Sequence, residues 1–497
     1  MRYFIAILFS IFIISCSSVK NGGERVHPKR EFRGAWIQAV NGQFMGMDEA
    51  AMKGYLTTML DNLQKINVNA IIFQVRVEGD ALYASPYEPW SRYLTGEQGK
   101  NPGWDPLAFM VEEAHKRNME LHAWINPYRA RTKGTKELAP THLSRVNPFA
   151  CIAYEGQLYF NPALKSNRDH ICKIITDIIA RYDIDGIHMD DYFYPYPVKG
   201  KEFNDDKHFA QSGCNDRGLW RRGNVNLLIE QIHNCVRAEK PWMKFGVSPF
   251  GIYRNASRWE WGSNSNGLQC YDDLNADVLH WIEQGWVDYC IPQIYWEIGH
   301  KAADYETLVG WWAKYAKERP LYIGQDVNRT VKAADTKEPQ RHQLVQKMDI
   351  QRSYSAVKGS CLWDAASAAN NVGGYRDILQ KEYQSHTALM PSMPFIDKKA
   401  PKKVKGAEVI ETDGGRVLVW LPAEQQSDVM NEPAKYVVYR FAKGEKVTTA
   451  SAANIVDITK KSYYRIPADE KGKVTYIVTV LDRLQNESKG VKCKVKL

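Results

Sequence analysis

The segment Asp185-Gly-Ile-His-Met-Asp-Asp-Tyr-Phe-Tyr194 joins an apolar, strand-like start to two adjacent carboxylates and a row of aromatic residues. Carboxylates at the end of a buried strand are unfavourable unless they are paired or take part in chemistry. Aromatic rings beside acids suit a sugar, because its C–H faces stack on rings while its hydroxyls bond to carboxylates. The segment therefore predicts a strand that ends in a carbohydrate site.

Strand-like and helix-like segments alternate around it, from residue 32 to about residue 381. The strand candidates are short and apolar: 33–40, 70–77, 120–128, 186–192, 244–250, 289–296, 321–327 and 359–367. Helical periodicity covers the segments between and after them: 48–66, 105–117, 167–182, 226–239, 273–284, 305–318, 341–353 and 375–383. Eight such units predict a (β/α)8 barrel, a TIM barrel, over 32–390. A doubly wound open sheet is the main alternative, but no glycine-rich phosphate loop follows the first strand.

The composition changes after residue 390. Residues 391–403 are rich in Pro and Lys and predict a linker. Beyond it, apolar and polar residues alternate at 416–421, 435–441, 462–466 and 474–480, with no helical pattern. This alternation predicts an all-β sandwich over 404–497. Its strand candidates resemble those of a fibronectin type III module, which spaces or binds rather than catalyses.

The N-terminus has the features of an export signal. Arg2 precedes an apolar run that is too short to cross a bilayer comfortably, and the run ends at Ser15-Cys16. A small residue before Cys resembles the bacterial lipoprotein box, so we expect a signal peptide at 1–15, a lipidated Cys16 and a tether at 16–31. An ordinary secretory signal is the alternative. A lipid anchor would place the chain, which we expect to be a monomer, on a membrane of the bacterial cell envelope, at the outer membrane or facing the periplasm.

Composition argues against several other classes of function. The net charge of +9 comes without a Lys/Arg run or a nucleic-acid module, so we expect no nucleic-acid partner. None of the nine Cys has metal-ligand spacing, and no His-x-His or His-Glu-x-x-His motif occurs. His122, His188, Asp190 and Asp191 could meet at a metal, but we predict neither a metal nor another cofactor.

The active site of a (β/α)8 enzyme lies at the C-terminal ends of the strands. Residues of one parity along a strand point to one side, and polar or aromatic residues recur in this way at the predicted strand ends. One or two could simply line the barrel, whereas this many predict a substrate cleft. The predicted substrate-binding residues are Gln74, Arg76, Glu78, His122, Trp124, Asn126, Tyr128, His188, Tyr192, Gln293, Tyr295, Trp296, Asp326 and Asp364.

Hydrolysis of a glycosidic bond needs two carboxyl groups. Asp190 is the best single candidate, because its parity points it into the barrel. Asp191 is its neighbour, and close like charges raise one of the two pKa values, as a general acid requires. Glu297, after the sixth strand, is the candidate second carboxyl across the barrel. Each could instead be an Arg-paired carboxylate that only shapes the cleft.

Five segments together resemble the glycosyl-hydrolase-like 10 family of bacterial lipoproteins. They are FRGAWIQAV (32–40), NVNAIIFQVRVEGDALYAS (67–85), WDPLAFMVEEAHKRNMELHAWINPYRA (104–130), DGIHMDDYFYPYP (185–197) and IPQIYW (291–296). The resemblance implies a TIM-barrel glycosidase. Some members cleave peptidoglycan strands that have lost their stem peptides, so it also implies that denuded polymer as substrate. A glycosidase for imported dietary or host polysaccharide and a non-catalytic glycan-binding lipoprotein are the alternatives.

Related glycosidase families refine the roles. In the α-amylase family the nucleophilic Asp follows Asp-Gly-x-Arg-x, and here His188 replaces the Arg before Asp190. In the chitinase family a catalytic Glu stands where Tyr192 stands here. An adjacent acidic pair is similar to that of other N-acetylhexosaminidases, which use substrate-assisted catalysis. Under that mechanism Asp190 and Asp191 would suffice, and Glu297 would only bind.

Overall fold

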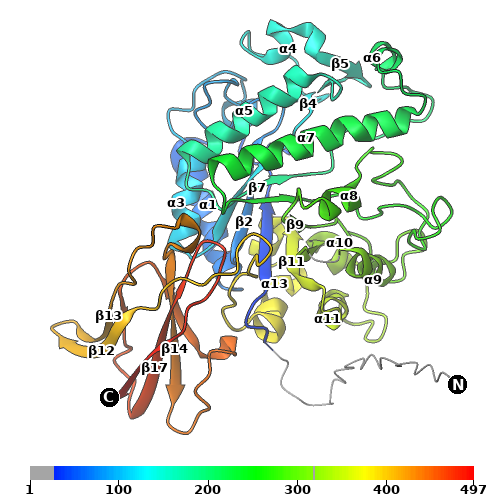
Figure 1. Cartoon of the computed structure of the whole chain (residues 1–497). Helices are drawn as coiled ribbons and strands as arrows, with labels where there is room; N and C mark the ends of the chain where they lie inside the picture. Colours follow the sequence, from blue (N-terminus) through cyan, green and yellow to red (C-terminus); the bar gives the residue numbers. More distant parts are fainter. Residues whose placement is uncertain (1–26, 317–318) are drawn as a thin grey trace, which may run out of the picture.

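Eight parallel strands close into a barrel in the computed structural model, which describes residues 27–316 and 319–497 (Figure 1). The strands are β1 (Phe32–Ile37), β2 (Ala70–Arg76), β3 (Glu120–Ile125), β7 (Gly186–Met189), β8 (Lys244–Val247), β9 (Tyr289–Cys290), β10 (Leu321–Asp326) and β11 (Val357–Trp363). Their order around the barrel is β1-β11-β10-β9-β8-β7-β3-β2. The predicted TIM-barrel fold is therefore confirmed.

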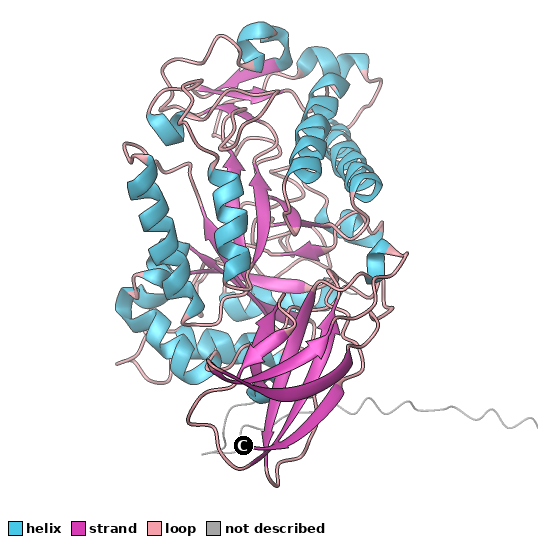
Figure 2. Ribbon diagram, turned by 90° about the vertical axis from the view of Figure 1, so that its left-hand side faces the viewer, coloured by secondary structure: helices cyan, strands magenta, loops and turns pink. Residues whose placement is uncertain are grey.

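Helices surround this barrel (Figure 2). They are α1 (Glu49–Gln64), α2 (Arg92–Thr95), α3 (Pro106–Lys116), α4 (Leu143–Val146), α5 (Lys165–Arg181), α6 (Asp206–Gln211), α7 (Arg217–Glu239), α8 (Val278–Glu283), α9 (Tyr305–Tyr315), α10 (Val327–Lys332), α11 (Leu344–Ser353), α12 (Ala365–Ala369) and α13 (Tyr375–Ile378). Side-chain caps explain several of their starts. Asp105 accepts the Ala108 N–H at 2.9 Å, with Pro106 in the first turn. Asp216 caps α7 in the same way, so this helix begins at Arg217 rather than at 226.

All eight predicted barrel strands end earlier than the sequence suggested, and local chemistry explains the two largest differences. The predicted strand 289–296 keeps regular pairing only through Cys290, because Pro292 has no N–H to donate; isolated bridges at Gln293 continue its course. The predicted strand 359–367 stops at Trp363, because the Asp364 side chain accepts the Ser367 N–H at 2.7 Å and starts α12.

A small sheet that the sequence did not predict follows β3. Its strands are β4 (Arg129–Arg131), β5 (Cys151–Tyr154) and β6 (Gln157–Phe160), in the order β4-β6-β5. In both views it lies at the end of the barrel opposite the C-terminal sheets (Figures 1 and 2). It therefore belongs to the loops at the C-terminal ends of the barrel strands.

The C-terminal part is all-β, as predicted. One sheet has the order β12 (Lys405–Thr412), β13 (Gly415–Leu421), β16 (Tyr463–Arg465), and the other β15 (Ile455–Thr459), β14 (Lys435–Ala442), β17 (Lys473–Leu481), β18 (Val491–Lys496). All their pairings are antiparallel. The sequence missed β12, β15 and β18. These sheets lie against the N-terminal end of the barrel, where Gln485 donates to Glu120 at 3.0 Å and Arg483 pairs with Asp183 at 2.7 Å.

Large side chains fill the barrel interior. Phe32 stacks on Tyr322 with ring centroids 4.0 Å apart, and Tyr289 lies 5.6 Å from Tyr322. Glycines on neighbouring strands make room for them: a Cβ at Gly246 would lie 2.1 Å from the Tyr289 ring. The interior is therefore a packed layer rather than a pore.

Within the described ranges, no helix combines the length and apolar character that crossing a bilayer requires. The predicted signal peptide and Cys16 lie outside the described residues.

Replacing Gly246 with Ala tests the packing of the interior. The new methyl group would overlap the Tyr289 ring, so we expect the free energy of unfolding to fall by about 1–3 kcal/mol. Gly54→Ala is the matched control: it lies exposed in α1 with nothing near its Cβ position, and we expect a gain of about 1 kcal/mol. Urea denaturation of both variants measures the difference, and equal midpoints would contradict the tight packing around Tyr289.

Candidate active site

Asp190 follows β7 directly and is only 4% exposed. Its carboxylate accepts three N–H groups: the Trp124 indole at 3.0 Å, the Asn126 amide at 3.1 Å and the Tyr192 backbone at 3.3 Å. Two of these donors come from the end of the neighbouring strand β3, where Trp124 pairs in register with His188. The closed sheet therefore brings these predicted site residues together around one carboxylate.

Asp191 is 2% exposed and has different partners. The Tyr196 hydroxyl donates to one of its oxygens, and the Gln293 amide donates to the other at 3.1 Å. Gln293 also donates to the Ser248 carbonyl at 2.9 Å, which fixes the position of its amide. Two adjacent residues thus turn toward different partners, Asp190 to the end of β3 and Asp191 to the loop after β7 and the segment after β9.

The two carboxyl groups differ in their electrostatics. Burial and the charge of Asp190 raise the pKa of Asp191 to about 7. Burial also raises the pKa of Asp190, but the Arg129 charge and the Asn126 and Trp124 N–H groups oppose the rise. The Arg129 charge and the three N–H donors favour ionisation of Asp190, whereas the charge of Asp190 opposes ionisation of Asp191. Near neutral pH the site therefore holds a carboxylate at 190 beside a carboxyl at 191 that can keep its proton.

Aromatic rings stand around the carboxyl pair. The Trp363 ring lies 6.1 Å from Trp124 in an edge contact and 6.3 Å from Tyr295 in a stacked one. On the other side, the Arg129 guanidinium covers the Tyr192 ring at 5.1 Å. Tyr192, Tyr295 and Trp363 are half-buried, so they present partly open rings beside the nearly buried acids. Rings in this arrangement can stack on sugar faces.

Trp296 and Glu297 lie farther along the segment after β9. Trp296 is half-buried and packs edge-on against Phe250 at 5.4 Å. In the described part of the chain, no hydrogen bond joins the Glu297 side chain to Asp190 or Asp191. Its charge acts instead on Lys347: burial lowers the pKa of that ammonium to about 8, and Asp326 and Glu297 oppose the fall.

Asp326 and Asp364, at the ends of β10 and β11, each cap a helix. Asp326 accepts the Arg329 N–H at 2.8 Å at the start of α10, and Asp364 accepts the Ser367 N–H at the start of α12. Both remain half-buried at the C-terminal end of the barrel. The second oxygen of Asp326 lies 3.7 Å from the Arg329 guanidinium, so this carboxylate is occupied by its own helix.

Three predicted residues of β2 and its loop hold the barrel wall together in this structure. Gln74 Oε1 accepts two backbone N–H groups of the loop after β1, at 2.9 and 3.0 Å. Arg76 forms a two-pronged ion pair with Glu88 at 2.8 and 2.7 Å, and Glu78 pairs with Arg92 at 3.1 Å. The pairing register of β2 with β3 shifts between Gln74 and Arg76. The predicted alternation of residues between the two faces of β2 therefore does not continue past this shift.

Three other predicted residues lie deeper. His122 and His188 are fully buried in the barrel interior and contact the Tyr289 hydroxyl at 2.7 and 3.1 Å. Tyr128 is also fully buried, but in the outer core, because Asn126-Pro127 ends the strand before it. None of the three lies among the half-buried rings around Asp190 and Asp191.

Three residues outside the predicted set also contact the site. Trp363 could have been found by parity, because residues 359, 361 and 363 of β11 face the interior and Trp363 is the last of them. Tyr196 reaches Asp191 through a loop that no periodicity describes, and Ser248 contributes a backbone carbonyl, which no residue type signals. Within residues 27–316 and 319–497, no group of three or more His, Cys, Asp or Glu side chains has the arrangement of a metal site.

Comparison with known proteins gives a consistent set of matches. A family model described as glycosyl hydrolase-like 10 matches residues 31–343. Glycosyl hydrolase YngK of Bacillus subtilis (strain 168) is 40% identical over 508 residues, covering 100% of this chain and 98% of that protein. Glycosyl hydrolase DigH of Escherichia coli (strain K12) is 39% identical over 279 residues, covering 53% of this chain and 63% of that protein. The catalytic domain of beta-amylase from Paenibacillus polymyxa, a solved structure, is 11% identical, with a TM-score of 0.48 over 73% of this chain and 99% of its own.

Removing the Tyr196 hydroxyl should raise the pKa of Asp191 further. A hydrogen bond to the charged form of a carboxyl favours that form, so its loss in Tyr196→Phe favours the protonated form. Carboxyl ¹³C NMR titration of the wild type should give about 7 for Asp191, and a higher value for the variant.

Tyr192→Phe is the control for this titration, because the Tyr192 side chain donates no hydrogen bond to Asp191 among the described contacts. We expect its Asp191 titration to stay close to that of the wild type. A fall in the pKa of Asp191 in Tyr196→Phe would contradict the hydrogen-bond assignment.

Proposed function

The chain belongs to the glycosyl hydrolase-like 10 family and is a glycoside hydrolase, and from this premise we propose that it cleaves a cell-envelope glycan with Asp190 and Asp191. The observation that carries the proposal is the asymmetric carboxyl pair at the C-terminal end of β7. One member accepts three N–H groups, and the other has a pKa of about 7. Acid–base cleavage of a glycosidic bond needs this combination of a carboxylate and a protonated acid.

Asp191 would act as the general acid. Its pKa leaves it largely protonated at or below neutral pH, so it can give its proton to the leaving oxygen as the glycosidic bond breaks. It then carries a negative charge and can take a proton from the water that completes hydrolysis. Tyr196 and Gln293 would hold its two oxygens in place through both steps.

Asp190 would orient the substrate. Three donors contact its two oxygens, and the Asn126 amide bridges both of them. An acetamido N–H on the sugar would share one of these oxygens as an additional donor. Held in this way, the acetamido oxygen can attack the anomeric carbon while the bond to the leaving oxygen breaks and Asp191 protonates that oxygen. Water then opens the resulting ring. Under this mechanism Glu297 binds substrate rather than catalyses.

This mechanism favours an N-acetylated polymer, and peptidoglycan glycan strands without stem peptides are the substrate we propose. Every sugar of such a strand carries an acetamido group for Asp190 to orient. The acids are 4% and 2% exposed and stand among aromatic rings. A bare strand reaches such acids more easily than one with a peptide beside the scissile bond.

Two alternatives make different demands on the site. A glycosidase for imported polysaccharide would use the same acids, and its substrate need not carry acetamido groups. A glycan-binding lipoprotein would use the rings alone and would need no acid with a raised pKa. The pKa of Asp191 and the membership of a hydrolase family therefore favour cleavage over binding.

We also propose that the chain works as a lipid-anchored monomer of the bacterial cell envelope. The support is the Ser15-Cys16 pair after a short apolar run, followed by a polar tether. An anchor of this kind would hold the enzyme beside its polymer.

Asp190→Asn should lower turnover of glycan strands by at least about a hundredfold, the typical contribution of one acid–base group. The variant amide keeps one acceptor oxygen but has no negative charge. In the wild type that charge orients the substrate and also raises the pKa of Asp191. Turnover and thermal denaturation of the purified variant measure the two effects separately. Wild-type turnover in a folded variant would refute the role of Asp190.

The substrate is tested with purified full-length protein and three polymers. We expect new reducing ends from glycan strands stripped of stem peptides, fewer from intact sacculi, and none from a β-1,4-glucan without acetamido groups. Cleavage of the glucan alone would favour the imported-polysaccharide alternative. Binding without new reducing ends from any polymer would overturn the proposed activity.

A further inference from the structure

A chain of hydrogen bonds runs along the barrel interior beneath the carboxyl pair. It begins at Glu120, whose carboxylate lies 3.1 Å from His122 Nε2. His122 Nδ1 lies 2.7 Å from the Tyr289 hydroxyl, which in turn lies 3.1 Å from His188 Nδ1. His188 Nε2 then contacts Ser248 Oγ at 2.9 Å. All five residues are at least nine-tenths buried, so the chain spans the interior without reaching solvent along its length.

The groups at its two ends set the direction of every bond. The Trp36 indole can only donate, and it points at His188 Nε2 from 3.4 Å. Acceptance at that nitrogen places the proton of the neutral ring on His188 Nδ1, and Ser248, whose hydroxyl also lies 3.4 Å from the Met189 carbonyl, then donates to Nε2. The Tyr289 hydroxyl oxygen accepts a hydrogen bond from His188 Nδ1–H, and the same hydroxyl donates a hydrogen bond to His122 Nδ1. His122 then donates from Nε2 to Glu120. Burial lowers the pKa of His188 well below its usual value, in agreement with a neutral ring.

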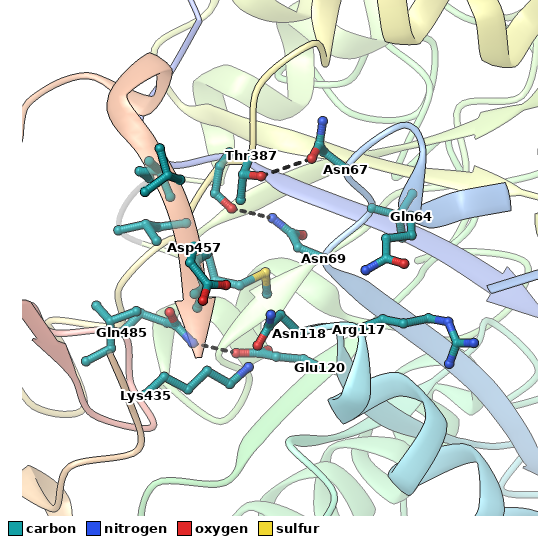
Figure 3. A pocket seen from close by; sticks show the side chains of 18 residues that line it. Gln64, Asn67, Asn69, Arg117, Asn118, Glu120, Thr387, Lys435, Asp457 and Gln485 are labelled. Carbon is teal, nitrogen blue, oxygen red and sulfur yellow. Dashed lines mark hydrogen bonds between the residues drawn. The ribbon is translucent and has the colours of Figure 1, made fainter. Parts of the chain in front are cut away.

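The lower end of the chain is held by two donors. Lys244 pairs with Glu120 Oε1, and Gln485, from the C-terminal sheets, donates to the same oxygen at 3.0 Å. Burial alone would raise the pKa of Glu120, but the Lys244 charge and the His122 contact outweigh it and hold it below its usual value. Figure 3 shows Glu120 and Gln485 joined at the wall of a cavity of about 210 Å³ between barrel and sheets, with Lys435 beside them. The acceptor that orders the chain is thus an ionised carboxylate.

The upper end reaches the proposed catalytic pair by two routes. His188 lies in β7, two residues before Asp190, and pairs in register with Trp124, whose indole donates to Asp190. Ser248, which His188 contacts, offers its backbone carbonyl to Gln293, and Gln293 donates to Asp191.

We propose that Tyr289 is a positioning residue for Asp190 and Asp191, acting by fixing the tautomer of His188. With Nδ1–H held by Tyr289, the lone pair of His188 Nε2 is free to anchor both Trp36 and Ser248. The other tautomer would set an N–H against the Trp36 N–H and release that side chain. This inference rests on the proposed function, because the pair it positions is the proposed catalytic one.

A neighbouring tyrosine provides a matched control. Tyr322 is fully buried in the same interior layer, 5.6 Å from Tyr289 between ring centroids. Its hydroxyl has no hydrogen-bond partner among the described residues. Removal of either hydroxyl deletes one buried oxygen from the same layer, but only the Tyr289 oxygen is a link of the chain.

The first test needs no substrate. Imidazole ¹⁵N shifts of histidine-labelled wild-type protein should show His188 as the Nδ1–H tautomer and His122 as the Nε2–H tautomer, each assigned by loss of its signal in a His→Gln variant. In Tyr289→Phe the His188 pattern should change or become a mixture, whereas in Tyr322→Phe it should not. An Nε2–H tautomer at His188 in the wild type would overturn the inference, whatever the enzyme cleaves.

The second test is kinetic. On glycan strands, Tyr289→Phe should lower kcat about tenfold, the rate equivalent of one buried hydrogen bond, and leave KM within about twofold. Tyr322→Phe should leave both within about twofold, and thermal denaturation of both variants checks folding. Equal kcat in the two variants would refute the positioning role. If the wild type cleaves no polymer, the proposed function fails, while the tautomer measurement still decides the state of the chain.

Discussion

Two adjacent carboxylates buried at the end of one strand are the constraint on which the rest of this site depends. Neither Asp190 nor Asp191 can be left without donors at 4% and 2% exposure, because an unpaired buried charge is far less stable than one in water. The donors come from segments that only a closed barrel brings together, Asn126 after β3 and Gln293 after β9. The barrel register therefore decides which donors reach each acid.

Polar residues below the pair obey the same constraint. Buried imidazoles and a carboxylate in a barrel would destabilise it unless each had a partner, and the chain through Tyr289 provides one for every ring nitrogen. Small residues make this packing possible: a Cβ at Gly186 would lie 2.7 Å from His122, as one at Gly246 would meet Tyr289. The polar chain and the glycines that surround it are thus parts of one arrangement.

Periodicity and parity predicted the barrel, the all-β C-terminal part and the position of Trp124, Asn126 and Gln293 at the same end of the barrel as the acids, although they predicted contacts with substrate rather than with the acids. Each of these follows from regular backbone, where alternate residues share a face. The prediction did not extend to segments without regular backbone. A register shift after Gln74 turns Arg76 toward Glu88. The loop that places Tyr196 beside Asp191 has no hydrophobic periodicity from which its course could be predicted. Helix caps at Asp326 and Asp364 depend on where a strand stops, which the pattern of apolar residues gives only approximately.

The C-terminal sheets gain a structural role from the same reasoning. They cover the N-terminal end of the barrel, where Glu120 and Asp185 line a cavity together with Lys435 and Gln485 of the sheets. Covering these groups lowers the local dielectric. The Glu120–Lys244 ion pair is then stronger, and a nearby buried polar group without a partner costs more free energy. Water could replace Gln485 as a donor to Glu120, but it would not hold one orientation. The sheets therefore give the Glu120 end of the hydrogen-bond chain a fixed donor. A barrel without them would keep Asp190 and Asp191, but the hydrogen-bond chain beneath these acids would be less ordered.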